Sequence, residues 1–66
     1  MKNNLKVQRA IHDMTQADVA EKIGVSRQTI NAMEKGKYVP STVLALKLSR
    51  LFETPVEKLF ELENND

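Results

Sequence analysis

The block from Gln16 to Met33, QADVAEKIGVSRQTINAM, constrains the fold more than any other part of the chain. Two helices that meet near a right angle through a short turn need a small residue where their axes approach, a glycine in the turn and apolar residues on both inner faces. Ala20 and Gly24 meet the first two needs. The third is met by Val19, Ile23, Val25, Ile30 and Met33. We therefore expect two short packed helices, with residues 15–35 as the core of the domain.

Capping residues, glycine and proline divide the rest of the chain into further short helices. We expect five in all, at residues 4–12, 16–23, 27–35 and 41–52 and in a segment that opens with Thr54-Pro55. In that last segment Thr54 is the expected N-cap and Pro55 the first helical residue. The predicted fold class is all-α, a compact five-helix domain that spans residues 1–66.

The C-terminal tail departs from the helical pattern. Residues 60–63, Phe-Glu-Leu-Glu, alternate apolar and acidic side chains. This alternation is typical either of a short strand that pairs with residues 2–4 or of the frayed end of a helix. We favour the strand, which would add a short two-stranded β element made from the N- and C-terminal tails.

Length and composition exclude several classes of protein. A chain of 66 residues has room for one domain, and so small a domain gains from a partner subunit. It has no cysteine, so disulfides and thiolate metal sites are excluded. The single histidine, His12, has no carboxylates at ligand spacing around it, so we interpret it as a solvated residue near a helix end.

The sequence contains no recognisable catalytic arrangement. No nucleophile–base pair, metal cluster or phosphate-binding loop can be assembled from these residues, so we expect no enzyme activity, cofactor, metal or small-molecule ligand. The N-terminus lacks the apolar core of a signal peptide, and no stretch reaches the roughly 18 apolar residues of a membrane span. We therefore expect a cytoplasmic protein without a membrane partner.

Charge is distributed unevenly along the chain, although the net charge is only +1. Residues 1–50 hold nine Lys and Arg against four acids, or +5, and residues 51–66 hold one against five, or −4. A basic body with an acidic tail suggests one surface for a polyanion and another kept away from it. The alternative is a solvated surface on which the segregation is accidental.

The predicted third helix presents a polar and basic face. Four side chains fall within about one 100° arc of the helix, at Arg27, Gln28, Asn31 and Lys35. Arg can bond guanine O6 and N7 in the major groove, and Gln or Asn can bond adenine N6 and N7. We therefore expect base contacts from Arg27, Gln28 and Asn31. The alternatives are a solvated face without a partner and, for Arg27 or Gln28, contact with a phosphate instead of a base.

A family resemblance covers nearly the whole chain. It rests on Leu5, Arg9, Thr15-Gln16, Val19-Ala20, Gly24-Val25-Ser26, Glu34-Lys35-Gly36, Pro40 and Leu59-Phe60. With these residues the sequence resembles the lambda-repressor/Cro-like, or Xre, helix-turn-helix regulators. The run VSRQTINAMEKGKYVPS and the short tail are similar in particular to the small dimeric repressors of this family, such as the repressor of a cytolysin operon.

The resemblance implies a lambda-repressor-like fold and a set of DNA contacts. Base-reading positions would be Arg27, Gln28 and Asn31, and phosphate contacts would come from Gln16, Thr29, Lys35, Lys37 and Tyr38. Arg9 and Glu34 match an internal ion pair that ties the first helix to the end of the third. Gln8 departs from the family pattern, which often has an apolar residue there, and this puts the packing of the first helix in doubt.

The fourth helix has more apolar surface than one core contact requires. Its apolar and small residues spread over about 160°, against the roughly 100° that one face needs. Residues 45, 48, 49 and 52 are expected to face the core, which leaves Leu44 and Leu51 near the surface. A second copy could cover these two with Phe60 or Leu62, so residues 41–66 are the expected dimerisation elements. The alternative is a monomer with scattered exposed leucines.

Together these features predict a sequence-specific transcriptional repressor that binds a palindromic operator as a homodimer. A two-fold dimer would place two reading helices about 34 Å apart, one turn of B-DNA. An antitoxin-type regulator whose second surface neutralises a partner, and a protein-interaction module that keeps the fold without binding DNA, remain alternatives.

Overall fold

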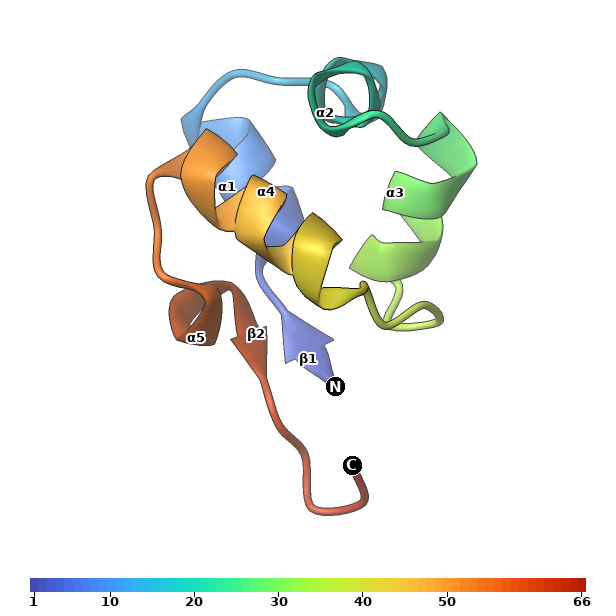
Figure 1. The fold of residues 1–66 in the computed structure, drawn as a ribbon, viewed down its shortest axis with the longest axis vertical. Helices are drawn as coiled ribbons and strands as arrows, with labels where there is room; N and C mark the ends of the chain where they lie inside the picture. The colour runs from blue at the N-terminus through green and yellow to red at the C-terminus, as the bar shows by residue number, and fades with distance from the viewer.

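The computed structural model describes residues 1–66 and contains five helices and two short strands (Figure 1). Their bounds are β1 Lys2–Asn3, α1 Leu5–Ile11, α2 Gln16–Ile23, α3 Arg27–Glu34, α4 Thr42–Phe52, α5 Val56–Leu59 and β2 Phe60–Glu61. The expected five-helix architecture is confirmed. The strand pairing is confirmed as well, over two residues of each tail.

Side-chain caps begin three of the helices. The Thr15 hydroxyl accepts a hydrogen bond from the Asp18 amide, and the Asp18 carboxylate accepts one from the Thr15 amide, which completes a capping box. Ser26 and Ser41 accept hydrogen bonds from backbone amides three residues further on. Gly24 ends α2 with a φ of 76°, a left-handed conformation that glycine adopts without strain. These local signals fix where α2, α3 and α4 begin and where α2 ends.

The start of α5 differs from the sequence-based expectation. Pro55, expected as the first helical residue, occupies the N-cap position, and the helix begins at Val56. The hydroxyl of Thr54 donates to the carbonyl of Phe52 at 2.8 Å, so it caps nothing in α5. The left-handed residue Glu53, at a φ of 50°, turns the chain sharply after α4, and this turn brings Thr54 back toward the helix that has just ended.

The two strands close the domain by joining its tails. β1 and β2 are antiparallel, with Lys2 opposite Glu61 and Asn3 opposite Phe60. In Figure 1 they lie side by side at the end of the molecule that also holds both termini. The Asn3 side chain donates to the Met33 carbonyl at 2.7 Å, so the N-terminal strand is also tied to the last turn of α3.

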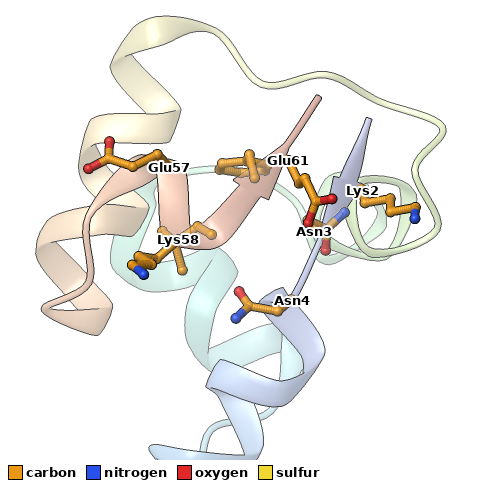
Figure 2. Close-up of a pocket in the computed structure, with 8 residues that line it drawn as sticks. Lys2, Asn3, Asn4, Glu57, Lys58 and Glu61 are labelled. Carbon is orange, nitrogen blue, oxygen red and sulfur yellow. The ribbon is translucent and has the colours of Figure 1, made fainter. Parts of the chain in front are cut away.

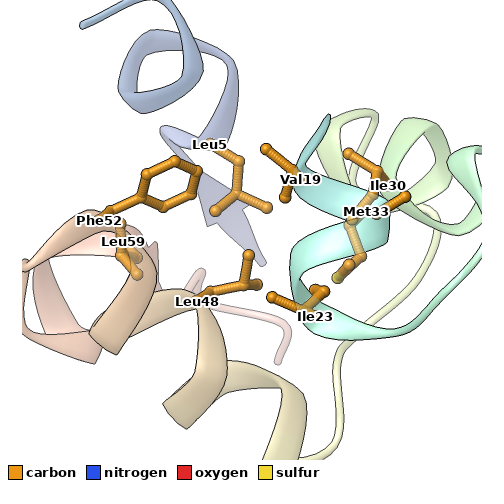
Figure 3. Packing of buried hydrophobic residues seen from close by; sticks show 9 residues of the cluster. Leu5, Val19, Ile23, Ile30, Met33, Leu48, Phe52 and Leu59 are labelled. Carbon is orange, nitrogen blue, oxygen red and sulfur yellow. The ribbon is translucent and has the colours of Figure 1, made fainter. Parts of the chain in front are cut away.

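The hydrophobic core draws on all five helices (Figure 3). Its nine buried residues are Leu5, Val19, Ala20, Ile23, Ile30, Met33, Leu48, Phe52 and Leu59. Full burial of one such Leu, Ile, Met or Phe side chain contributes about 1.5–3 kcal/mol. Five of the nine belong to α2 and α3, so the helix pair that the sequence singled out is held by the centre of the core.

The structure refines two expectations about exposure. Leu44 and Leu51 are half-buried and pack against the core cluster, whereas Val43 and Leu46 of α4 are 62% and 58% exposed. The most exposed apolar face of α4 is therefore at Val43 and Leu46, which were not singled out from the sequence. His12 is half-buried as well, because its ring lies 5.3 Å from the ring of Phe52.

Candidate nucleic-acid interface

The outer face of α3 is polar and its inner face is in the core. Ile30 and Met33 are fully buried, whereas Arg27, Gln28 and Lys35 are exposed. Neither Arg27 nor Gln28 forms an ion pair or side-chain hydrogen bond within the chain. Their long donor-bearing side chains are therefore available to a ligand, on a helix whose position is set by core packing.

Asn31 lies on the same arc but is not a free side chain. It is half-buried, and its Oδ1 accepts a hydrogen bond from Nε2 of Gln16 at 3.2 Å. Sequence periodicity places Asn31 on the outer face but contains no information about Gln16, which begins the neighbouring helix α2. The crossing of α2 and α3 brings these two amides together.

Arg9 and Glu34 form the internal ion pair that the family resemblance implies. Both Nε and Nη2 of Arg9 donate to the Glu34 carboxylate, the second at 3.0 Å, and Nη1 donates to the Met14 carbonyl at 3.1 Å. Burial would raise the pKa of Glu34, but hydrogen bonds from Arg9 and Gln16 and the charge of Arg9 hold that pKa below its ordinary value. The carboxylate is therefore ionised at neutral pH.

Gln16 connects this ion pair to Asn31. Its Nε2 lies 3.2 Å from Oδ1 of Asn31 and 3.2 Å from Oε1 of Glu34. Both N–H groups of the Gln16 amide are used inside the protein, so this side chain has no donor left for a phosphate in this arrangement. The backbone N–H of Gln16, at the first position of α2, has no intrahelical acceptor.

The other expected phosphate contacts lie at the two ends of α3. Thr29 is half-buried in the first turn, and its hydroxyl lies 2.9 Å from that of Ser26. At the opposite end, Lys37 and Tyr38 are exposed in the loop that follows Gly36. Gly36 has a φ of 73°, so the chain turns away from the helix axis at once and keeps Lys37 beside the end of α3. The expected groups therefore bracket the polar face.

Sequence reasoning missed an exposed apolar face next to these residues. Val39 is 64% exposed and lies beside Leu46, which in turn lies beside Val43. Beside it lies a hollow of about 550 Å³ whose lining is mainly apolar and includes Met1, Val39, Pro40, Leu46, Val56 and Phe60. The spacing of Val43 and Leu46, three residues apart on α4, was the signal that could have found this face.

A second hollow lies beside the two strands and α5 (Figure 2). Its volume is about 250 Å³, and its labelled lining side chains include the acids Glu57 and Glu61 and the bases Lys2 and Lys58. Two acids and two bases line it, which favours neither an anion nor a cation. Nowhere in the chain do three or more His, Cys, Asp or Glu side chains gather as metal ligands would. None of the helices combines the length and the apolar character needed to cross a membrane.

Known proteins resemble this chain over its full length. It is 53% identical to an uncharacterised HTH-type transcriptional regulator of Methanocaldococcus jannaschii over 66 residues, which is all of both chains. It is 46% identical, again over all of both chains, to the uncharacterised HTH-type transcriptional regulator YgzD of Bacillus subtilis.

Two solved structures share the fold. The restriction-modification controller protein C.AhdI from Aeromonas hydrophila has a TM-score of 0.76 at 27% identity, with 85% of each chain covered. The SOS-response transcriptional repressor LexA from Eubacterium rectale has a TM-score of 0.80 at 32% identity, with 96% of this chain and 67% of the solved chain covered. The helix-turn-helix family model matches residues 5–59, which include every helix described above. The chain therefore belongs to the Xre/Cro-like helix-turn-helix family of transcriptional regulators.

Proposed function

We propose that the protein is a transcriptional repressor that binds a palindromic operator as a homodimer, with α3 of each subunit in the major groove. One observation carries this proposal: the inner face of α3 is fully buried while Arg27 and Gln28 on its outer face are exposed and unpaired. A helix held in this way can enter the groove without rearranging the core. The names of the relatives, which are transcriptional regulators and a repressor, support the same function.

Base recognition would rest mainly on Arg27 and Gln28. Each can form two hydrogen bonds with one base edge, and a good bidentate contact discriminates against the wrong base by about 1–3 kcal/mol. Asn31 would contribute a third contact from its half-buried position. Because all three are on one regular helix, their spacing along the groove is fixed before DNA is bound.

Phosphate contacts would fix the register of this helix on the duplex. Lys35, Lys37 and Tyr38 would reach the backbone at the C-terminal end of α3, and Thr29 near its start. For Gln16 we propose that the phosphate contact implied by the family resemblance comes from the backbone N–H at the start of α2. Backbone amides at a helix N-terminus bind phosphate favourably.

The second subunit would cover the exposed apolar face. We propose that Val39, Val43 and Leu46 form the centre of the interface, together with Phe60, which lines the adjoining hollow, and the 77% exposed Leu62. The half-buried Leu44 and Leu51, expected in the interface from the sequence, have core contacts already and would contribute at most an edge. In a two-fold dimer, Leu46 of each subunit can enter the hollow of the other.

The same apolar face also favours a second candidate, an antitoxin-type regulator or interaction module in which a different protein occupies it. The two candidates differ in the behaviour of the protein alone. A homodimer shows twice the subunit mass in sedimentation equilibrium at micromolar concentration, whereas a surface made for another protein leaves a monomer.

Selection of bound fragments from a random duplex pool tests the DNA-binding function directly. We expect the wild-type protein to enrich a two-fold symmetric sequence with half-sites about one helical turn apart. An Arg27→Ala variant should lose the base preference at one position in each half-site of the selected sequences. A pool that shows no enrichment over repeated rounds would contradict sequence-specific binding.

A further inference from the structure

We infer that Gln16, held by the Arg9–Glu34 ion pair, fixes which end of the Asn31 carboxamide faces the DNA, so that Asn31 presents its NH₂ group. The inference rests on the proposed function, because it concerns how the same face reads bases. Gln16 and Glu34 act here as positioning residues: they set the orientation of a reading group without reading a base.

The first step concerns the orientation of Gln16. The O and N atoms of an amide are told apart by their hydrogen-bond partners. An ionised carboxylate only accepts hydrogen bonds. Oε1 of Glu34 lies 3.2 Å from the terminal amide of Gln16, and Arg9 supplies the charge that keeps Glu34 ionised. The group of Gln16 that faces Glu34 must therefore be its NH₂.

The second step passes this orientation on to Asn31. The same nitrogen of Gln16 lies 3.2 Å from the Asn31 carboxamide, and it has a second N–H to donate. The atom of Asn31 that faces it must be an oxygen, because the opposite orientation would bring two NH₂ groups together with no acceptor between them. The acceptor-only character of Glu34 thus determines the orientation of two amides in series.

The third step gives the consequence for recognition. Nδ2 of Asn31 forms no hydrogen bond within the chain, and it belongs to the arc that also holds Arg27 and Lys35. A free asparagine can turn either end toward a base, whereas a fixed one offers the donor. Donors match guanine O6 and N7, adenine N7 and thymine O4, and they oppose the amino group of cytosine. Asn31 should therefore discriminate between bases more sharply than an unrestrained asparagine.

The chain offers two variants that release this restraint in different ways. In a Glu34→Gln variant, residue 34 gains an NH₂ group that can donate to Oε1 of Gln16, so that both amides can turn over. In a Gln16→Met variant, the donor to Asn31 is removed but the Arg9–Glu34 ion pair remains. If Glu34→Gln fails to fold, Gln16→Met still tests the inference.

The first experiment uses the free protein and does not depend on DNA. Hydrogen exchange of side-chain amides, followed by ¹⁵N–¹H NMR, should show both Gln16 protons protected relative to those of the exposed Gln28. In the Glu34→Gln variant this protection should fall. Gln16 protons that exchange as fast as those of Gln28 would overturn the inference.

The second experiment measures base preference. Selection from a random duplex pool with wild type and Asn31→Ala identifies the operator position that Asn31 reads. At that operator position, Gln16→Met and Glu34→Gln should lower the enrichment ratio between the most and the least preferred base by roughly tenfold. The position whose preference is lost in Arg27→Ala should keep its wild-type preference in both variants. Thermal melts confirm that each variant is folded.

Each outcome of this selection has a distinct meaning. Variants that bind all sequences more weakly but keep the wild-type ratio at the position that Asn31 reads would overturn the inference and leave the proposed function intact. An Asn31→Ala variant that keeps the wild-type base preference at every operator position would overturn the inference too. A wild-type protein that enriches no sequence would instead refute the proposed function, and amide exchange would still decide the orientation of Gln16.

Discussion

Two exposed surfaces of this small domain lie close together in sequence but have opposite chemistry. The outer face of α3 displays Arg27, Gln28 and Lys35, whereas the surface that follows it displays Val39, Val43 and Leu46. Hydrogen bonds and charge at the first surface would give binding that depends on base sequence and salt. Apolar area at the second would give association that depends little on salt. This difference supports the proposal that DNA recognition and self-association use separate surfaces.

The largest expected effect comes from placing a charge on the apolar surface. In a Leu46→Asp variant, each dimer would bury two unpaired carboxylates at about 1–3 kcal/mol or more apiece. We therefore expect the dimer Kd to rise at least about 30-fold in sedimentation equilibrium. Ile11→Asp is the matched control, because Ile11 is a similarly exposed apolar residue on α1. Equal effects of the two substitutions would show that the apolar surface of Val39, Val43 and Leu46 does not form the dimer interface.

An Arg27→Ala variant tests the reading surface. We expect a loss of about 1–3 kcal/mol on the selected operator and a smaller loss on unrelated DNA, because a base contact is removed. Fluorescence anisotropy titrations with both duplexes measure the ratio of the two dissociation constants. A Leu46→Asp variant should lose cooperative binding to the full site and keep the preference for its half-site sequence. If Arg27→Ala weakened both duplexes equally, the residue would contact a phosphate.

Lowering the pH should weaken the Arg9–Glu34 ion pair, which holds the end of α3, before it changes the apolar surface of Val39, Val43 and Leu46. Burial acts to raise the pKa of Glu34, but hydrogen bonds from Arg9 and Gln16 and the charge of Arg9 hold that pKa below its ordinary value of 4.5. The ion pair therefore stabilises the fold above pH 4.5, and this stabilisation disappears as pH falls through the lower pKa of the folded state.

Urea denaturation checks this prediction. At pH 7, Glu34→Gln should lower the free energy of unfolding by about 1–3 kcal/mol, since the Arg9 guanidinium loses its charged partner. The gap between wild type and variant should narrow as the solution is made more acidic. A gap that is the same at pH 7 and pH 3 would mean that Glu34 contributes through packing rather than through its charge.

The smallest expected effect is that of a single phosphate contact. Lys37→Ala should weaken binding to every duplex by a similar factor and reduce the slope of log K against log salt by about 0.9 for each phosphate that is no longer neutralised. Lys58→Ala is the matched control, because it removes an exposed lysine of α5, away from α3. Comparable changes in slope for both would show that general charge, and no specific contact, is responsible.

The sequence predicts local structure well where the signal is local. The hydroxyls of Thr15 and Ser26 and the left-handed Gly24 fix the ends of α2 and α3, and period-3.6 spacing identifies Ile30 and Met33 as core residues. In these cases the responsible atoms lie within a few residues of one another. The short tail strands were also predicted, from alternation over only four residues.

Features that depend on how helices meet could not be predicted in this way. Helical spacing gives the angular spread of apolar residues on α4, but it does not show which side the other helices cover. Leu44 and Leu51 were therefore expected near the surface; they are half-buried against the core, and the most exposed apolar residues of α4 are Val43 and Leu46. The Gln16 contact with Asn31 has the same origin, since it arises from the crossing of two helices.

The pairing of β1 with β2 has a consequence for the dynamics of the domain. It joins Asn3 to Phe60, in segments almost a whole chain apart that the core already holds together through Leu5 and Leu59. With only two residues in each strand, this sheet should be among the first parts to open in the native state. Because Asn3 also donates a hydrogen bond to the Met33 carbonyl, each opening would remove this one bond from the last turn of α3, while Met33 stays in the core and Glu34 stays paired with Arg9. Opening of the tail sheet would thus reach the C-terminal end of α3 through a single hydrogen bond.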